Sequence, residues 1–253
     1  MTIAGVETTC VGGAEVARLG VEETARLMCD VARAPPRPEC PYYFTSVNGE
    51  VLARRAMDAA FAQQIDHADL ISADGQPLVV ASRLLSRRPL PERVATTDLY
   101  PAVARMAEDS GASFYLLGAS EDVNRATYEA TKRDCPRLDI RGRSHGYLKG
   151  AALDAKLDEI NALAPDILWL AMGVPLEQQF VADHARRLYN VKMIKTSGGL
   201  FDFVAGAKRR APRWMQDAGL EWAFRLGLEP RRLFKRYLTT NPIAAFLLLT
   251  RTR

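Results

Sequence analysis

Residues 166–172 read DILWLAM, and this stretch decides the fold class. After the leading Asp166 every residue is apolar, without the alternation of a strand that has one wet face. A strand that is buried on both faces of a parallel sheet has such a near-continuous apolar run. We therefore expect a central strand here. Gly173 follows as a turn, and residues 175–188 are expected to form a helix with proline in its first turn.

Strands and helices alternate around this stretch. Short apolar or β-branched runs predict strands at residues 42–47, 68–73, 113–117, 138–142 and 191–196. Helical patterns are found at residues 21–32, 48–61, 98–109, 121–132 and 153–163, and Asp98 is the expected N-cap of the third. The alternation predicts an α/β fold, with a Rossmann-like parallel sheet flanked by helices.

The C-terminal part of the chain differs in charge. Residues 207–253 carry eleven Lys or Arg against three acidic residues, whereas residues 1–206 carry 23 basic and 27 acidic residues. The apolar residues Trp214, Ala218, Trp222 and Leu226 are spaced by four, which predicts a helix. A second helix should start at Pro230 and end at residues 239–242. We expect a catalytic core at 1–206 and a basic helical appendage at 207–253.

Several classes of protein are excluded by missing motifs. The chain has no GxGxxG after a strand, no GxxxxGK[ST] and no GxSxG, which argues against dinucleotide dehydrogenases, P-loop enzymes and α/β-hydrolases. Its four cysteines are scattered, so we expect reduced thiols rather than a zinc site. No segment approaches the roughly 20 apolar residues of a membrane span, and no signal peptide is evident. We therefore expect a cytoplasmic protein that can touch the membrane.

Polar or glycine-rich turns follow several predicted strands. In open parallel sheets, ligands bind beyond the carboxyl ends of the strands, and backbone N–H groups there can hold a phosphate. The candidates at these turns are Ser46, Asn48, Gly75, Gly118, Gly173, Gly198, Gly199 and Asp202. A glycine after a strand often serves only to form a turn. The recurrence of such turns after several strands is therefore more informative than any single glycine.

Asp74 and the tail arginines each allow two interpretations. Asp74 follows an apolar strand, where partial burial suits a general base, but it could instead cap the next helix. Arginine binds phosphate bidentately, so the basic tail predicts an anionic partner: a phosphate, a lipid headgroup or nucleic acid. A merely solvated basic face is the other interpretation. Nucleic acid is disfavoured, because the aromatic residues of the tail fall in an apolar helical stripe.

The order of the longer motifs resembles one family. These motifs are TSVNGEVL (45–52), HADLISADG (67–75), FYLLGAS (114–120), RGRSHGYL (141–148), INALAPDILWLAMGVPLEQQF (160–180) and GGLFDFVAGAKRRAPRWMQDAGLEWAFRLGLEPRRLFKRYL (198–238). Together they resemble the WecG/TagA/CpsF family of bacterial glycosyltransferases over nearly the whole chain.

The resemblance implies an inverting glycosyltransferase of cell-surface polysaccharide biosynthesis. Its donor would be a UDP-sugar of the N-acetylmannosamine type, its uronic acid, or a hexose such as glucose. Its acceptor would be a polyprenyl-diphosphate-linked sugar at the inner face of the membrane. A non-catalytic nucleotide-sugar scaffold or sensor is the alternative, and a homo-oligomer is left open.

The resemblance also assigns roles to residues. Asp74 falls on the family's proposed base, and Ser46 and Asn48 fall on its Thr-x-Asn pair, with serine in place of threonine. The residues expected to bind substrate are Gly75, Gly118, Gly173, Gln178, Gly198, Gly199, Asp202, Arg210, Arg225, Arg232 and Arg236. Since the chain contains no Asp-x-Asp, we expect no metal and no cofactor, with the basic tail stabilising the leaving diphosphate.

Overall fold

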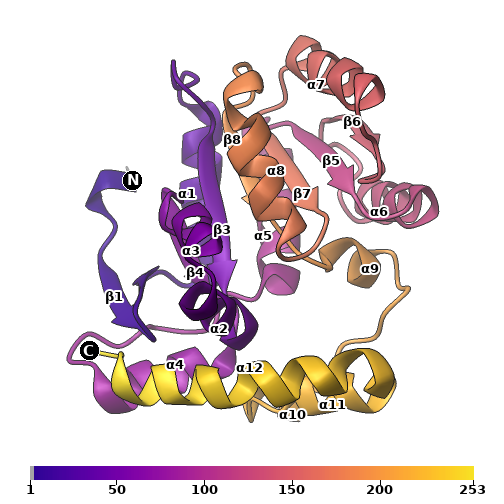
Figure 1. The fold of residues 1–253 in the computed structure, drawn as a ribbon. Helices are drawn as coiled ribbons and strands as arrows, with labels where there is room; N and C mark the ends of the chain where they lie inside the picture. Colours follow the sequence, from indigo (N-terminus) through magenta and orange to yellow (C-terminus); the bar gives the residue numbers. More distant parts are fainter. Residues whose placement is uncertain (1–2) are drawn as a thin grey trace.

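A six-stranded parallel sheet lies at the centre of the computed structural model, which describes residues 3–253 apart from the side chain of Arg232. The strands follow the order β4-β3-β8-β7-β5-β6, and every pair is parallel (Figure 1). Their bounds are β3 (Tyr42–Val47), β4 (Leu70–Ala73), β5 (Phe114–Gly118), β6 (Ile140–Ser144), β7 (Ile167–Ala171) and β8 (Met193–Thr196). The parallel α/β fold expected from the sequence is confirmed.

The DILWLAM stretch forms β7, in the interior of the sheet. All five residues of this strand are buried, as the continuous apolar run predicts. On one face, the Trp169 ring packs edge-on against Tyr100 at 4.8 Å and also contacts Phe114. On the other face, Leu168 and Leu170 join a separate cluster of buried side chains. The strand is therefore in contact with apolar layers on both sides.

Helices cover both faces of the sheet. They are α1 (Val21–Arg33), α2 (Gly49–Met57), α3 (Ala59–Asp66), α4 (Gln76–Leu85), α5 (Thr96–Ser110), α6 (Glu121–Asp134), α7 (Ala151–Leu163), α8 (Leu176–His184) and α9 (Leu200–Val204). Side chains of α1, α5 and α9 pack with Phe44, Phe114 and Trp169 on one face. Side chains of α7 and α8 pack with Tyr43, Tyr115 and Leu170 on the other.

Three local features differ from the sequence expectations. The helix expected at 48–61 is two helices, because the Asp58 side chain caps α3 by accepting from the N–H groups of Ala60 and Phe61. Asp98 does not cap α5, which starts earlier at Thr96 and has Ala95 at its N-cap; Asp98 instead binds arginines. Helix α4 was not expected.

An antiparallel hairpin precedes the main fold and was also not expected. Strands β1 (Thr8–Val11) and β2 (Ala14–Ala17) are joined by Gly12 and Gly13, whose φ angles are +59° and +84°. Two successive positive φ angles are what the tight turn of a hairpin requires, and glycine adopts them without steric cost. Val11, Ala14 and Val16 then pack under β4 in a buried cluster.

The basic tail forms three helices: α10 (Arg213–Asp217), α11 (Glu221–Leu228) and α12 (Pro230–Thr250). The apolar stripe expected on one helix is split between α10 and α11, because Gly219 takes a φ of +73°. The start at Pro230 is confirmed, but the end expected at 239–242 is wrong. Helix α12 continues through Pro242 and runs across the end of the molecule (Figure 1).

Tertiary packing explains why α12 continues past its proline. Beyond Pro242, the buried side chains of Leu247 and Leu248 join Val51 and Leu52 of α2 in one cluster. Such packing routinely overrides local propensity. Removing residues 207–253 would therefore uncover core side chains as well as the basic surface. In the part of the chain that is described, no helix is both long and apolar enough to cross a membrane.

Candidate functional site

The carboxyl ends of β3, β4 and β8 bring Ser46, Asn48, Asp74 and Lys195 together. Val47 is paired with Ala73 in the parallel register, and the Asp74 N–H donates to the Val47 carbonyl at 2.8 Å. Gly75 lies against Asn48, since a Cβ on the glycine would be 3.5 Å from the Asn48 Cβ. The Asn48 Oδ1 accepts from the Val51 N–H at 3.1 Å, which leaves its Nδ2 hydrogens for another partner.

Asp74 has the environment of a general base. It is partly buried, and its Oδ2 accepts a hydrogen bond from the Thr96 hydroxyl at 3.2 Å. Burial raises the pKa of its carboxyl to about 6. The positive charge of Lys195 and, more weakly, the charges of Arg225 and Arg93 act to lower that pKa. The N-cap of α4 is Gly75 and carries no side-chain cap, so the alternative role of Asp74 as a helix cap is wrong.

Lys195 belongs to this cluster and was missed by the sequence analysis. Its side chain is fully buried, and its Nζ donates to the Ser46 Oγ at 2.8 Å and to the Thr196 carbonyl at 2.9 Å. Burial lowers the pKa of its ammonium group to about 8, although the carboxylates of Asp74 and Glu177 oppose this shift. A lysine inside the strand predicted at 191–196 was the available signal, because lysine is almost never buried without partners.

Gln178 is buried beside Glu177. Only 1% of the surface of Gln178 is exposed, and its Nε2 is 3.3 Å from the Glu177 Oε1. The Glu177 Oε2 accepts from the Gly198 N–H at 2.8 Å. The structure therefore places Glu177, rather than Gln178, in contact with the glycine turn that follows β8.

The glycines at the strand ends differ in their surroundings. A Cβ on Gly118 would be 2.2 Å from the Ala171 carbonyl oxygen, so this glycine is required by the close packing of β5 on β7. Gly173 and Gly198 have φ angles of +80° and +59°, and a Cβ on either would meet no atom within 4 Å. Gly199 is next to Asp202. The turns at Gly173 and Gly198 are thus the open ones, where a ligand could approach the backbone.

Asp202 connects the core to the tail. Its Oδ2 pairs with the Lys208 Nζ at 2.8 Å, and that ammonium group lies 4.0 Å from the Glu229 Oε1. The carboxylate expected to bind substrate therefore already has a cationic partner.

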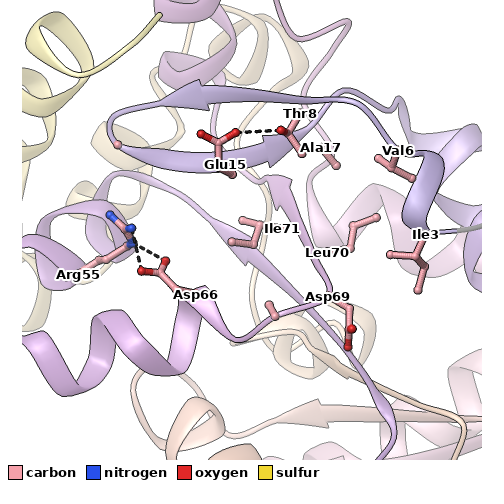
Figure 2. Close-up of a pocket in the computed structure, with 12 residues that line it drawn as sticks. Ile3, Val6, Thr8, Glu15, Ala17, Arg55, Asp66, Asp69, Leu70 and Ile71 are labelled. Carbon is pink, nitrogen blue, oxygen red and sulfur yellow. Dashed lines mark hydrogen bonds and ion pairs between the residues drawn. The ribbon is translucent and has the colours of Figure 1, made fainter. Parts of the chain in front are cut away.

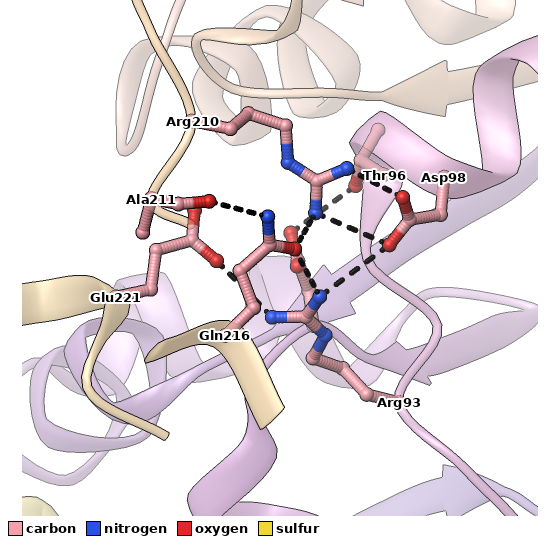
Figure 3. A network of polar contacts seen from close by, with 8 residues as sticks. Arg93, Thr96, Asp98, Arg210, Ala211, Gln216 and Glu221 are labelled. Atoms are coloured by element: carbon pink, nitrogen blue, oxygen red, sulfur yellow. Dashed lines mark hydrogen bonds and ion pairs between the residues drawn. The ribbon is translucent and has the colours of Figure 1, made fainter. Parts of the chain in front are cut away.

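A polar network connects the tail to the part of the core that surrounds Asp74. Figure 3 shows the side chains of Arg93 and Arg210 converging on Asp98 and Gln216. Arg93 also reaches Glu221 of α11 at 3.1 Å. Because the same network includes the first turn of α5, where Thr96 contacts Asp74, it fixes the tail relative to the candidate base. Arg210, expected to bind substrate, has its guanidinium engaged here.

The other tail arginines are in different settings. The Arg225 guanidinium lies over the Phe203 ring, 5.0 Å from its centroid, and forms no ion pair with an acidic side chain of the described residues. Arg236 pairs with Glu50 at 2.8 Å and so ties α12 to the start of α2. The side chain of Arg232 lies outside the described residues. Arg225 is therefore the best placed of the described tail cations to meet a phosphate near Asp74.

The structure has a cavity at each of two places around the sheet. One of about 370 Å³ is lined by Ile3, Val6 and Leu70 with the paired charges Arg55 and Asp66 (Figure 2). Its residues surround the amino end of β4, away from Asp74. A second, of about 350 Å³, lies between α5 and α9 and is lined in part by Phe203 and Arg210, so it borders the polar network. Among the described residues, no three His, Cys, Asp or Glu side chains gather in a way that could hold a metal ion.

Comparison with known proteins decides the family. The profile described as "Glycosyl transferase WecG/TagA/CpsF family" matches residues 9–253. The chain belongs to this glycosyl transferase family. It is similar to an N-acetylglucosaminyldiphosphoundecaprenol N-acetyl-beta-D-mannosaminyltransferase of Bacillus subtilis, with 31% identity over 81% of this chain and 78% of the relative. A protein of the same name from Bacillus spizizenii is 32% identical over 75% of this chain and 72% of the relative.

The cluster combines a partly buried carboxylate with nearby positive charge. Asp74 is the carboxylate, Ser46 and Asn48 lie beside it with polar hydrogens, and Lys195 and Arg225 supply positive charge. Four of these five residues, all except Lys195, are among those that the sequence predicts as site residues. Lys195 was missed because its role depends on partners far away in the chain.

Proposed function

We propose that the chain transfers a sugar of the N-acetylmannosamine type from a UDP-sugar to a polyprenyl-diphosphate-linked acceptor, with inversion at the anomeric carbon. A uronic acid of that sugar and a hexose such as glucose are the other donors considered. The names of the two relatives support the acceptor and the sugar class. They state N-acetylglucosaminyldiphosphoundecaprenol and the transfer of an N-acetyl-beta-D-mannosaminyl group. The observation that carries the proposal is the partly buried Asp74 at the carboxyl end of β4.

In the proposed reaction, Asp74 takes the proton from the acceptor hydroxyl while the oxygen of that hydroxyl bonds to the anomeric carbon of the donor sugar. The bond from that carbon to the UDP oxygen breaks, and its electron pair leaves with the diphosphate. A carboxyl with a pKa of about 6 is mostly ionised at neutral pH and still basic enough to accept a proton. Arg225, together with Arg232, is the proposed source of positive charge for the leaving diphosphate.

The decisive experiment is a screen of UDP-sugars with a polyprenyl-diphosphate primer that carries one N-acetylglucosamine. Mass spectrometry of the lipid product would identify the transferred sugar. We expect a product one N-acetylhexosamine heavier than the primer. Tight binding of UDP-sugars without any product, across donors and primers, would instead favour the non-catalytic scaffold or sensor.

Metal independence is part of the proposed function. It is supported by the missing Asp-x-Asp in the sequence and by the cations Lys195 and Arg225 near Asp74. We expect turnover to stay within about twofold after treatment with EDTA and desalting, since guanidinium groups can stabilise phosphate charge without a metal. The measurement is UDP release with and without added Mg²⁺ or Mn²⁺. Loss of turnover in EDTA that either ion restores would contradict this prediction.

The site of action is proposed to be the inner face of the cell membrane, where the protein is peripherally bound. Exposed apolar side chains on α4 and α12 support this. They include Leu84, Phe234, Leu238, Phe246 and Leu249, each at least 60% exposed. Arg251 and Arg253 follow directly after α12. Apolar side chains flanked by cations bind anionic membranes by burial and by charge attraction.

Paired substitutions test this surface. Phe246→Asp with Leu249→Asp should abolish sedimentation with anionic vesicles, because each loses about 2 kcal/mol of apolar burial, or more than tenfold in partitioning. Tyr189→Asp is the matched control, since Tyr189 is 58% exposed but precedes β8, at the opposite end of the sheet from the candidate site. Transfer to a water-soluble acceptor should remain normal in all variants. Undiminished vesicle binding by the double variant would show that this surface is not the membrane contact.

A further inference from the structure

Lys195 occupies a costly position. Its side chain is fully buried in β8, a central strand, where it is paired in register with Phe44 on one side and Trp169 on the other. An ammonium group loses hydration there that an apolar side chain of the same length would not lose. The stability of the sheet therefore does not explain a lysine at this place, and the groups that the lysine touches indicate its role.

The hydrogen bond to Ser46 has a defined direction. A protonated lysine has only donors, so the Ser46 Oγ accepts from the Lys195 Nζ, at 2.8 Å. The hydroxyl proton of Ser46 must then point elsewhere. Among the described residues, no acceptor takes this proton. Since Ser46 is partly exposed near the carboxyl end of β3, its O–H can donate to a ligand oxygen beside Asp74.

The charge of Lys195 faces two carboxylates. Asp74 follows β4, and Glu177 lies on α8, where its Oε2 is held by the Gly198 N–H. Asp74 is also faced by Thr96 of α5, by Arg93, and by Glu221 and Arg225 of α11. Of the cations around Asp74, Lys195 opposes the effect of burial most strongly. One buried cation thus connects the candidate base with the hydroxyl beside it.

We propose that Lys195 is a positioning residue of the transfer reaction, which fixes the Ser46 hydroxyl as a donor toward an oxygen of the nucleotide sugar and supplies the buried positive charge that faces Asp74. This inference rests on the proposed function, in which Asp74 is the base. Lys195 itself does not touch the substrate, because its ammonium group is enclosed by the protein.

The test is the pH dependence of turnover in Lys195→Met. Asp74 acts as a base only when ionised, so the activity of the native protein should fall as the pH drops through about 6. Removing the facing cation raises the pKa of Asp74. The acid limb of the pH profile, where turnover falls as Asp74 is protonated, should therefore move up by about 1 pH unit. Above about pH 8 native Lys195 loses its proton and can accept from Ser46, so an alkaline limb is expected there; Lys195→Met should lack it.

Two further comparisons separate positioning from folding. If Lys195 acts through Ser46, Lys195→Met should lower turnover about 10²-fold in the native background but much less in Ser46→Ala, because the effects of coupled residues are not additive. Ser46→Thr, which retains the hydroxyl, should stay active. Lys192→Met is the matched control: it removes a lysine that pairs with Asp166 at the opposite end of the strand, and should leave both limbs unchanged.

A measurement without substrate distinguishes this inference from the proposed function. ¹³C NMR of the Asp74 carboxyl, assigned with Asp74→Asn, reports its titration whether or not transfer occurs. A higher Asp74 pKa in Lys195→Met supports the inference. An unchanged Asp74 titration, or strictly additive effects of Lys195→Met and Ser46→Ala, overturns it. If Lys195→Met fails to fold, Lys195→Gln replaces it, with the same outcomes decisive.

Discussion

Asp74→Asn is expected to lower kcat by about 10²- to 10⁴-fold, the usual loss when a general base is removed. Asparagine has nearly the same shape and can still accept from the Thr96 hydroxyl, which lies 3.2 Å from the native Oδ2. It cannot take a proton from the acceptor hydroxyl. The loss should therefore appear in the chemical step. UDP binding, measured by calorimetry, should stay within a few-fold of the native value.

The control for this variant is Asp122→Asn. Its carboxylate is exposed on α6, where it pairs with Arg125, one turn along the same helix. This variant should keep full turnover. Asp74→Asn with turnover close to native would mean that another group removes the proton. An equal loss of UDP binding would mean that Asp74 orders the site rather than acting as the base.

Arg225→Ala is the second large effect expected, a fall in kcat of about 10²- to 10³-fold, comparable with the loss of one stabilising donor from an active site. The Arg225 guanidinium lies over the Phe203 ring near Asp74 and forms no ion pair with a carboxylate of the described chain. Its charge is thus available for the diphosphate. Arg225→Lys should recover only part of the activity, because an ammonium group cannot bind phosphate bidentately.

Turnover of the Arg225 variants is best compared at the plateau of each pH profile, between the acid limb near pH 6 and the alkaline limb near pH 8. Arg225 lowers the pKa of Asp74, so its removal also raises the fraction of protonated base near pH 6. On that plateau Asp74 is ionised and Lys195 is protonated in each variant, and the remaining loss reflects the diphosphate. Arg213→Ala, an exposed arginine at the start of α10, is the control and should be fully active. Turnover of Arg225→Ala within twofold of native would exclude this arginine from the leaving-group site.

Point substitutions are preferable to deleting the tail. Leu247 and Leu248 at the end of α12 belong to the same buried cluster as Val51 and Leu52. A protein lacking residues 207–253 would expose this cluster and lose the network between Arg93, Arg210 and Asp98. The loss of activity in such a protein would not distinguish catalysis from folding.

The sequence by itself determined the layout of the core. The apolar run at 166–172 predicts a strand that is buried on both faces. The neighbouring predicted strands place Asp74, Ser46 and Asn48 at one edge of a parallel sheet. Such patterns are local, because the period of a strand or helix is written in residues that are close together in the chain. The family was likewise indicated by the sequence, because its motifs and their order can be read directly along the chain.

The tertiary structure alone decided which side chains meet. Ser46 and Lys195 are 149 residues apart in sequence, and Arg210 and Asp98 are 112 apart. No local pattern records such partners. Likewise, α12 continues past Pro242 because its far end packs on α2, and Asp98 binds arginines instead of capping α5. Burial and charge pairing depend on what the folded chain brings together, so the environment of the candidate base became visible only in three dimensions.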